Sequence, residues 1–402
     1  MIHMKKILMV MPHMVGGGAE RVASLLVNYF YENSIETKFV LTADSSDEVV
    51  RCDLKEEVPL ILLKEEMKSE TLGEKLKYFP AKILSKVVCR VYETLKKDVP
   101  AYWAYLSILW QHHREIQALR NMMLESPDMT VIAFLQPAIP IVLLASRGLP
   151  NKIIISERCD PKRLMKKRYG RRFIKKYYSR ADKVVFQTLD AKEIYPENIS
   201  EKGVVIPNPI KGSLPLSFEG KRNTTITTFC RISKQKNLPM LIKAFSMLQR
   251  NCSEYELKII GDAPNEEGRE VVAELEKMVA KLGLEQKVHF MPFSAEVHRE
   301  ILQDAMYVNS SDYEGISNAM LEAMAIGMPV VCTDCPIGGA RTMIQNEENG
   351  LLTPVGDAEA LYKAMKKVIE NKVLADKISH NATEIRKTLS LENIAKQWME
   401  LL

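Results

Sequence analysis

The chain has 402 residues, of which 46% are hydrophobic and 27% are charged, and its net charge is +5. This length predicts two domains of about 200 residues each, and the composition is that of a folded globular protein, which excludes an intrinsically disordered chain. The seven cysteines are odd in number and scattered, which suits a reducing compartment better than a disulfide-bonded secreted protein.

The start of the chain and its most apolar run lack the features of secreted and membrane-spanning proteins. Residues 1–10 pass directly into a strand, without the cationic stretch, long apolar stretch and cleavage site of a signal peptide. The longest apolar run, residues 131–145, is shorter than a bilayer-spanning helix and contains Gln136, Pro137 and Pro140. We therefore expect a cytoplasmic protein.

The first predicted elements are those of a doubly wound α/β domain. An apolar strand over residues 6–11 is followed by the glycine turn Gly16–Gly18 and by a helix over residues 19–31. The glycine spacing is not G-x-G-x-x-G, and no acidic residue after the next strand, 37–41, is placed to hold a ribose. A nicotinamide-dependent oxidoreductase is therefore a weak alternative.

Residues 64–127 give the least specific signal in the first half. Two long helical patterns cover residues 72–95 and 102–124. They carry the aromatic residues Tyr78, Phe79, Tyr92, Tyr102, Trp103, Tyr105 and Trp110. Packing between helices is one interpretation, and contact with a membrane interface or a lipid-linked acceptor is the other.

Further strands and a strongly basic segment complete the first half. The strands 131–135, 152–156, 183–187 and 203–206 alternate with helical patterns, as in a parallel sheet. The basic segment, Lys162 to Lys176, contains no acidic residue and nine cations: Lys162, Arg163, Lys166, Lys167, Arg168, Arg171, Arg172, Lys175 and Lys176. Anionic lipid attracts such a cluster, and no nucleic-acid motif accompanies it. We predict an anionic membrane surface as its partner and no nucleic acid; a solvated helix face is the alternative.

Two prolines mark the boundary between the predicted domains. Ile206-Pro207-Asn208-Pro209 ends the first sheet, and a turn-rich stretch follows it. The predicted domains are therefore residues 1–208 and 209–389. Residues 390–402 form an amphipathic helix with Ser390 as its N-cap.

The second half opens with two cations that can reach a common ligand. Arg231 follows the strand 224–230, and Lys236 precedes a helix over residues 239–248. A guanidinium and an ammonium at these places can bind one diphosphate, and surface cations in a loop are the alternative. The strands 257–261 and 288–291 follow, and Asp262 comes directly after the first of them.

Residues 305–336 carry the strongest pattern in the chain. A strand (306–309), a polar loop (310–316), a helix (317–326) and a second strand (329–332) place Glu314 in the loop and Glu322 in the helix. Gly315 lets the backbone approach a ligand, and the N-terminus of the helix favours an anionic or polyhydroxyl ligand. The alternative is that Glu314 caps the helix and Glu322 is a solvated helix residue. Cys332 and Cys335 form a C-x-x-C without a second pair, so a zinc or redox site is disfavoured.

The same segment resembles a known family. Its pattern S-x-x-E-G-x-x-N-x-x-L-E-A-M-A-x-G-x-P-V-V-x-T-D-C-P is similar to the E-x7-E segment of retaining family 4 glycosyltransferases with the glycosyltransferase-B fold. Ser-Glu-Arg-Cys-Asp-Pro at residues 156–161 resembles a subset that builds bacterial surface polysaccharides, where many other members carry a histidine. The resemblance implies two Rossmann-like doubly wound α/β domains facing a central cleft. The N-terminal domain binds the acceptor, the C-terminal domain binds the nucleotide-sugar donor, and the last helix, 390–402, packs back on the first domain.

The resemblance also implies roles for individual residues. The implied catalytic residues are Glu314, near the reacting face of the sugar, with Arg231 and Lys236 on the diphosphate. Implied donor contacts also come from Gly16, Gly17, Gly261, Asp262, Met291, Phe293, Gly315, Ile316, Ser317, Asn318 and Glu322, of which Glu322 accepts from the ribose hydroxyls. Glu157 and Arg158 are candidates for sugar or phosphate contact. One departure is Cys230, which stands where the family has glycine.

The implied function is that of a retaining, metal-independent hexosyltransferase. It moves a hexose or N-acetylhexosamine from a nucleotide sugar, expected to be UDP-linked, to a lipid-linked or polysaccharide acceptor in bacterial glycan biosynthesis. We expect it at the inner face of the cell membrane, without a cofactor or metal, since no D-x-D stands in a suitable loop. The alternative is a non-catalytic module that binds a nucleotide or an anionic lipid.

Overall fold

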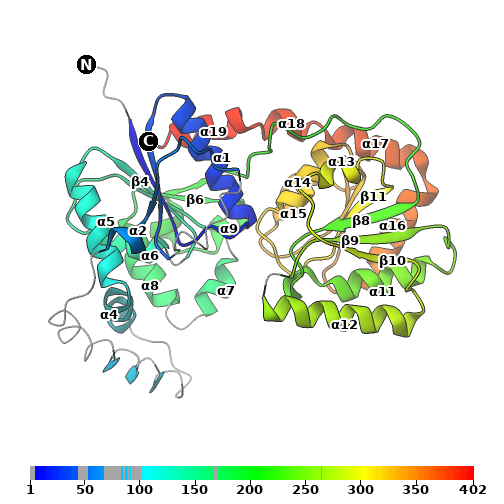
Figure 1. Cartoon of the computed structure of the whole chain (residues 1–402), viewed down its shortest axis with the longest axis horizontal. Coiled ribbons are helices and arrows are strands. Elements are labelled where there is room, and N and C mark those ends of the chain that lie inside the picture. The colour runs from blue at the N-terminus through cyan, green and yellow to red at the C-terminus, as the bar shows by residue number, and fades with distance from the viewer. Residues whose placement is uncertain are drawn as a thin grey trace. The chain divides into compact units, whose positions relative to one another are not determined.

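The computed structural model divides the chain into two compact units (Figure 1). It describes residues 5–43, 53–67, 101–136, 138–158, 160–166, 170–263 and 265–402, together with a few positions between 83 and 94. The first unit contains Met1–Pro209 and Ile394–Leu402, and the second contains Ile210–Asn393. The division falls one residue after the expected boundary at 208, and the second unit extends four residues beyond 389.

The first unit is built on a parallel sheet of seven strands in the order β3-β2-β1-β4-β5-β6-β7. Strands β1, β4 and β5 consist mostly of apolar residues and are almost wholly buried, as expected of strands that are covered on both faces. The strands are β1 (Lys6–Met11), β2 (Glu36–Leu41), β3 (Leu60–Leu62), β4 (Thr130–Phe134), β5 (Ile153–Ser156), β6 (Lys183–Phe186) and β7 (Gly203–Val205).

Helices surround this sheet (Figure 1). They are α1 (Gly18–Glu32), α2 (Leu63–Glu66), α4 (Ala101–Gln111), α5 (His113–Glu125), α6 (Ala138–Ala145), α7 (Pro161–Lys166), α8 (Gly170–Tyr177), α9 (Leu189–Glu193) and α10 (Glu197–Ser200), with a 3-10 turn, η2 (Tyr178–Arg180). The expected helix over residues 102–124 is interrupted at His112, where α4 ends and α5 begins. Most of the expected helix over residues 72–95, with Tyr78, Phe79 and Tyr92, lies outside the described residues.

The end of the chain packs on the first sheet. The last helix is α19 (Leu391–Met399), and its residues from Ile394 onward belong to the first unit. Trp398 is fully buried, and its ring centroid lies 5.6 Å from that of Phe134 at the end of β4. A buried tryptophan contributes a large apolar area, so this helix completes the core of the first unit.

The second unit is built on a parallel sheet of six strands in the order β10-β9-β8-β11-β12-β13. The strands are β8 (Thr225–Phe229), β9 (Glu256–Ile260), β10 (Val288–Met291), β11 (Met306–Asn309), β12 (Val330–Thr333) and β13 (Leu351–Thr353). Its helices are η3 (Lys234–Lys236), α11 (Leu238–Leu248), α12 (Glu266–Leu282), α13 (Val297–Glu300), α14 (Asn318–Ala325), α15 (Gly339–Met343), α16 (Ala358–Glu370), α17 (Lys372–Ala382) and α18 (Ile385–Thr388). The predicted fold class, α/β with two doubly wound units, is confirmed.

No helix in the described part of the chain is both long enough and apolar enough to cross a bilayer.

Candidate functional site

The candidate site lies at the carboxyl ends of β8 and β11 in the second unit. These strands are neighbours in the sheet, and the chain continues from β8 to one side and from β11 to the other. Ligands of open parallel sheets bind at such a reversal of strand order, beyond the carboxyl ends of the strands. The loops that leave these two strands, residues 230–237 and 310–317, carry all three predicted catalytic residues, Arg231, Lys236 and Glu314.

Hydrogen bonds join the two loops. The Asp312 N–H donates to the Gln235 carbonyl at 2.9 Å, and the Ser310 hydroxyl donates to the Lys236 carbonyl at 2.8 Å. Asn237 has a positive φ of 43° and caps α11, and its side-chain amide donates to Asp312 at 2.6 Å. These bonds fix the backbone on both sides of Lys236, so its side chain leaves the loop from a defined position.

Glu314 and Lys236 form an ion pair at the centre of the site. The side chains are 13% and 17% exposed, respectively. The Gln235 side-chain amide donates to Glu314 Oε2 at 3.2 Å, and the Ser311 hydroxyl donates to Oε1 at 3.0 Å. Burial by itself lowers the pKa of Lys236, but the Glu314 carboxylate outweighs burial, so that the pKa is raised and the ammonium stays charged. Gln235 and Ser311 were not predicted from the sequence.

Arg231 and Cys230 stand at the same edge of the sheet. Arg231 is exposed and follows β8 by two residues. Burial raises the pKa of the Cys230 thiol, and the charges of Lys236, Glu314 and Arg231 also act on it. The loop that carries Lys236 therefore also carries Arg231 and Cys230.

The loops after β9 and β10 lie beside this centre. The Gly261 N–H donates to the Met291 carbonyl at 2.9 Å, and the Phe293 N–H donates to an Asp262 carboxylate oxygen at 3.0 Å. Gly261 has a φ of 149°, and an added Cβ would lie 1.9 Å from the Cys230 carbonyl oxygen, so only glycine fits. The Met291 and Phe293 side chains are exposed at this edge.

Residues 315–318 connect Glu314 to α14. Ser317 is the N-cap of α14, and its hydroxyl accepts from the Met320 N–H at 3.3 Å. Ile316 and Ser317 are buried, whereas Gly315 and Asn318 are half-buried. A Cβ on Gly339 would lie 1.6 Å from the Gly315 carbonyl oxygen, so the backbone after β12 supports this turn closely.

Glu322 is buried on α14, and the alternative of a solvated helix residue is wrong. Its residue is 6% exposed, and its Oε2 lies 2.9 Å from His298 Nε2. A carboxylate at such a depth is expected to have a partner. His298 was not predicted from the sequence.

In the first unit, the glycine turn is closed by a carboxylate of the chain itself. Glu20 is 4% exposed and accepts from the Gly17 N–H and, at 3.1 Å, from the Val15 N–H, while His13 Nδ1 lies 3.2 Å away. Burial by itself raises the pKa of Glu20, but the bonds from His13 and the two backbone N–H groups outweigh it, and the pKa is lowered. Gly16 has a φ of 92°, which allows the turn. The Gly17 N–H is therefore engaged within the chain, and Glu20 was not predicted.

Glu157 and Arg158 are buried in the first unit, directly after the end of β5. Glu157 Oε1 accepts from the Tyr178 hydroxyl and, at 3.2 Å, from the Gln136 amide. Arg158 donates to Ser156 at 2.9 Å and to Asn208 at 2.7 Å, and its guanidinium lies over the Phe134 ring at 4.6 Å.

Burial shifts the pKa of each group in the direction that favours its neutral form. It raises the pKa of Glu157 and lowers the pKa of Arg158 to about 9. One oxygen of Glu157, Oε2, and one nitrogen of Arg158, Nη2, are buried without a hydrogen-bond partner among the described residues. A sugar or phosphate that touches either atom must therefore reach a covered part of the unit.

The described part of the basic segment is exposed on one side and anchored on the other. Lys162 and Arg163 on α7 are exposed, as are Arg171, Arg172, Lys175 and Lys176 on α8. Phe173, Ile174 and Tyr177 on α8 are buried. The side chains of Lys166, Lys167 and Arg168 lie outside the described residues. The apolar side of α8 is thus buried within the first unit, and the described cations face solvent.

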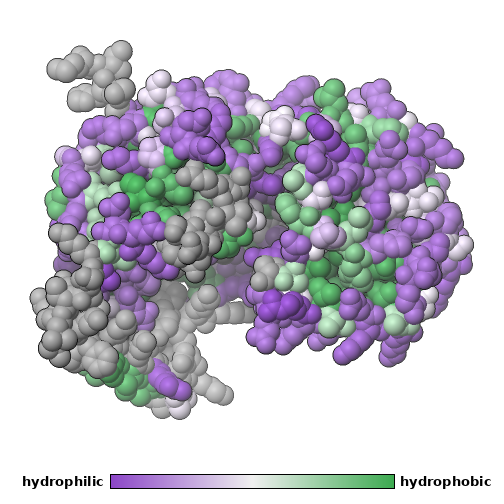
Figure 2. Space-filling view, in the orientation of Figure 1, coloured by the Kyte–Doolittle hydropathy of each residue, from purple (hydrophilic) through white to green (hydrophobic). Residues whose placement is uncertain are grey.

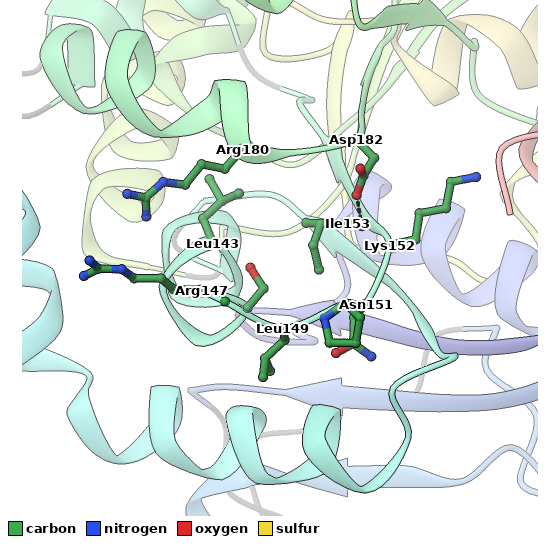
Figure 3. Close-up of a pocket in the computed structure, with 11 residues that line it drawn as sticks. Leu143, Arg147, Leu149, Asn151, Lys152, Ile153, Arg180 and Asp182 are labelled. Carbon is green, nitrogen blue, oxygen red and sulfur yellow. Dashed lines mark hydrogen bonds between the residues drawn. The ribbon is translucent and has the colours of Figure 1, made fainter.

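A separate pocket of about 580 Å³ lies at the amino end of β5, opposite the edge that carries Glu157 (Figure 3). The Asp182 carboxylate accepts there from the Ile153 N–H at 2.7 Å, and the Arg147 and Arg180 side chains point to the same side. None of the predicted site residues lines this pocket.

Comparison with known proteins matches most of the second unit to a family. Residues 217–385 match the family described as glycosyl transferases group 1. An uncharacterized glycosyltransferase of Haemophilus influenzae is 26% identical over 223 residues, which are 55% of this chain and 61% of that protein. The chain thus spans less than two thirds of this relative's length.

A second relative has a named substrate, and a solved structure shares the fold. The N-acetylgalactosamine-N,N'-diacetylbacillosaminyl-diphospho-undecaprenol 4-alpha-N-acetylgalactosaminyltransferase of Campylobacter jejuni is 25% identical, over 68% of this chain and 76% of that protein. The crystal structure of Anabaena HepE in complex with UDP and glucose superposes with a TM-score of 0.74 at 18% identity, covering 99% of each chain. Residues 217–385 therefore match the group 1 glycosyltransferases and the chain has the glycosyltransferase-B fold, which confirms the predicted resemblance to glycosyltransferases of bacterial polysaccharide synthesis.

Proposed function

We propose that this protein transfers a hexose or N-acetylhexosamine from a UDP-linked sugar to a lipid-linked or polysaccharide acceptor, with retention of anomeric configuration. The observation that carries the proposal is the Lys236–Glu314 pair, held by Gln235 and Ser311 at the strand-order reversal of the second sheet. A charged ammonium, a carboxylate and a helix N-terminus at one point suit a substrate that combines phosphate with sugar hydroxyls.

The leaving group of this reaction is a nucleoside diphosphate whose negative charge grows as the bond to the sugar breaks. Lys236 and Arg231 stabilise this charge, the first from a fixed loop and the second from the exposed edge of the sheet. The Glu314 carboxylate raises the pKa of the buried Lys236 and so keeps its ammonium charged at neutral pH. We propose that these cations act in place of a metal ion.

Glu314 binds the transferred sugar and does not attack it. Its carboxylate already accepts from three side chains, Lys236, Gln235 and Ser311, so it is oriented as a hydrogen-bond acceptor. We propose that the bond from the anomeric carbon to the diphosphate oxygen breaks and that the acceptor oxygen bonds to the same face. The acceptor proton passes to the departing diphosphate oxygen, which balances the step.

The nucleoside is proposed to lie against the loops after β9 and β10. The exposed Met291 and Phe293 side chains offer apolar surface to a base, and Asp262 fixes the backbone at Phe293. Glu322 accepts from the ribose hydroxyls. A UDP donor is supported by the solved structure of HepE with UDP, and a lipid-linked acceptor by the undecaprenol-linked substrate in the name of the Campylobacter jejuni relative.

The basic segment is proposed to bring the first unit to the inner face of the cell membrane. The six described cations of the segment face solvent, and each cation near an anionic surface contributes about 1 kcal/mol. Reversing the charge of Lys175 and Lys176 should reduce binding to vesicles that contain phosphatidylglycerol, with no change for neutral phosphatidylcholine vesicles. Equal binding of the wild type and the charge-reversed variant to the anionic vesicles would remove this part of the proposal.

The second candidate function is a non-catalytic module that binds a nucleotide. The test is donor hydrolysis by the wild type and by Glu314→Ala, with a panel of UDP-, GDP- and ADP-sugars, next to UDP affinity by calorimetry. A transferase should hydrolyse one donor slowly, and the variant should lose most of this turnover while keeping its UDP affinity. Nucleotide binding without turnover of any donor, in the presence or absence of membrane extract as acceptor, would favour the module instead.

A further inference from the structure

His298 is the side chain that holds Glu322 in place. Its Nε2 lies 2.9 Å from Glu322 Oε2, and the two side chains are 12% and 8% exposed. A carboxylate can only accept a hydrogen bond, so the contacting nitrogen of His298 carries a hydrogen. The pair therefore fixes both the tautomer of the imidazole and the position of one carboxylate oxygen.

The imidazole ring is itself positioned by an aromatic neighbour. The Phe229 ring meets His298 edge to face, with the centroids 5.7 Å apart and the planes at 85°. Phe229 is the last residue of β8, two positions before Arg231, and its ring also packs against Tyr307 on β11. His298 is thus held from the strand that leads into the candidate site.

The segment that carries His298 is short and tied to the loop after β10. Helix α13 has only four residues, and the Ser294 hydroxyl spans it by donating to Glu300 at 2.5 Å. The Phe293 N–H just before this segment is fixed by Asp262. The path from Asp262 through Phe293 to His298 and Glu322 therefore links the loop proposed for the base to the carboxylate proposed for the ribose.

We infer that His298 is a positioning residue that orients Glu322 for recognition of a ribose diol, and so makes the site selective for ribonucleotides over nucleotides that lack these hydroxyls. This inference rests on the proposed function, because it assigns Glu322 to the ribose of the donor. His298 does not touch the substrate; it acts through the Glu322 carboxylate, whose Oε2 it holds.

Two near-isosteric variants separate this role from packing. His298→Gln keeps an N–H donor at the reach of Nε2, whereas His298→Met has similar length and no donor. His289→Met is the matched control, because His289 on β10 also contacts a carboxylate, Glu256 at 3.1 Å, but at an exposed place. Affinities for UDP and for 2′,3′-dideoxy-UDP are measured by calorimetry, and thermal unfolding checks that each variant is folded.

We expect His298→Met to weaken UDP binding about tenfold, the size of one hydrogen bond to a charged group, and to leave the already weaker binding of 2′,3′-dideoxy-UDP unchanged. His298→Gln should regain most of the UDP affinity, and His289→Met should equal the wild type. Equal weakening toward both nucleotides, or wild-type UDP affinity in His298→Met, would overturn the inference while leaving the proposed function intact. A wild type that binds none of UDP, GDP and ADP would overturn both.

Discussion

Replacing Lys236 by methionine removes the ammonium from the centre of the candidate site. Loss of one partner from a fully buried ion pair costs about 3–5 kcal/mol, because the other charge is left buried and unpaired. Here the side chains of Lys236 and Glu314 are 17% and 13% exposed, and Gln235 and Ser311 continue to donate to the carboxylate. We therefore expect Lys236→Met to lower the free energy of unfolding by about 2 kcal/mol.

A double-mutant cycle isolates the pair from its surroundings. Glu314→Gln leaves the ammonium without its carboxylate and should cost about as much as Lys236→Met. The double variant has neither charge, so its loss should be smaller than the two single losses together by about 1–2 kcal/mol. Urea unfolding followed by circular dichroism measures these values, and slow hydrolysis of the donor sugar is measured on the same samples.

Stability and turnover should separate in this cycle. The double variant should recover part of the stability and none of the turnover, because the leaving diphosphate still lacks the Lys236 ammonium. Additive losses of stability would show that the two groups do not interact in the folded protein. Wild-type turnover in the double variant would refute the role of Lys236 on the leaving group.

Three further predictions concern the framework of the two units. Gly261→Ala should destabilise the second unit by about 3 kcal/mol or more in urea unfolding, because its Cβ would lie 1.9 Å from the Cys230 carbonyl oxygen, whereas Gly212→Ala, in open space, should be near neutral. Trp398→Ala should cost about 3–5 kcal/mol by the same measurement, because Trp398 is fully buried. Glu20 has a lowered pKa, so its contribution is present above the usual value of 4.5 and is lost as pH falls through the folded-state pKa. Glu20→Gln should therefore show a smaller drop in Tm than the wild type as pH falls from 4.5, and an unchanged pH dependence would contradict the assigned bonds.

The sheet edges of both units could be predicted because parallel strands have a regular signal. Apolar runs such as residues 6–11 and 306–309 mark buried strands, and polar residues directly after them fall at the carboxyl edge. Lys236 and Glu314 are 78 residues apart, yet they follow neighbouring strands and meet. Their contact was accessible to sequence analysis for this reason.

Contacts made by single side chains between distant loops have no comparable signal. Gln235, Ser311 and His298 were missed because a glutamine, a serine and a histidine in loops or short helices fit many environments equally well. His298 lies 24 residues from Glu322, on a four-residue helix without periodicity. Only the fold brings the imidazole to the carboxylate.

Burial of charged residues is the other part that the sequence could not supply. Charged side chains are rarely buried, so Glu157 and Arg158 after β5 read as edge residues available to a ligand. Their burial depends on Tyr178, on Asn208 and on Trp398 from the last helix of the chain. Glu20 differs, because glutamate three residues after Gly17 is the spacing of a capping box and could have been found.

The N-termini of α1 and α14 differ in charge, which explains why we expect the diphosphate in the second unit. The first turn of α1 already has a carboxylate, Glu20, on the Gly17 N–H, and a phosphate placed there would meet a buried negative charge. The N-terminus of α14 is capped by the neutral hydroxyl of Ser317, and the nearby Glu314 charge is balanced by Lys236. Arg231, which is exposed, adds a second cation to this edge. The helix dipole and the cations at the N-terminus of α14 therefore stabilise a bound anion. At the N-terminus of α1, the Glu20 carboxylate already occupies the position of such an anion.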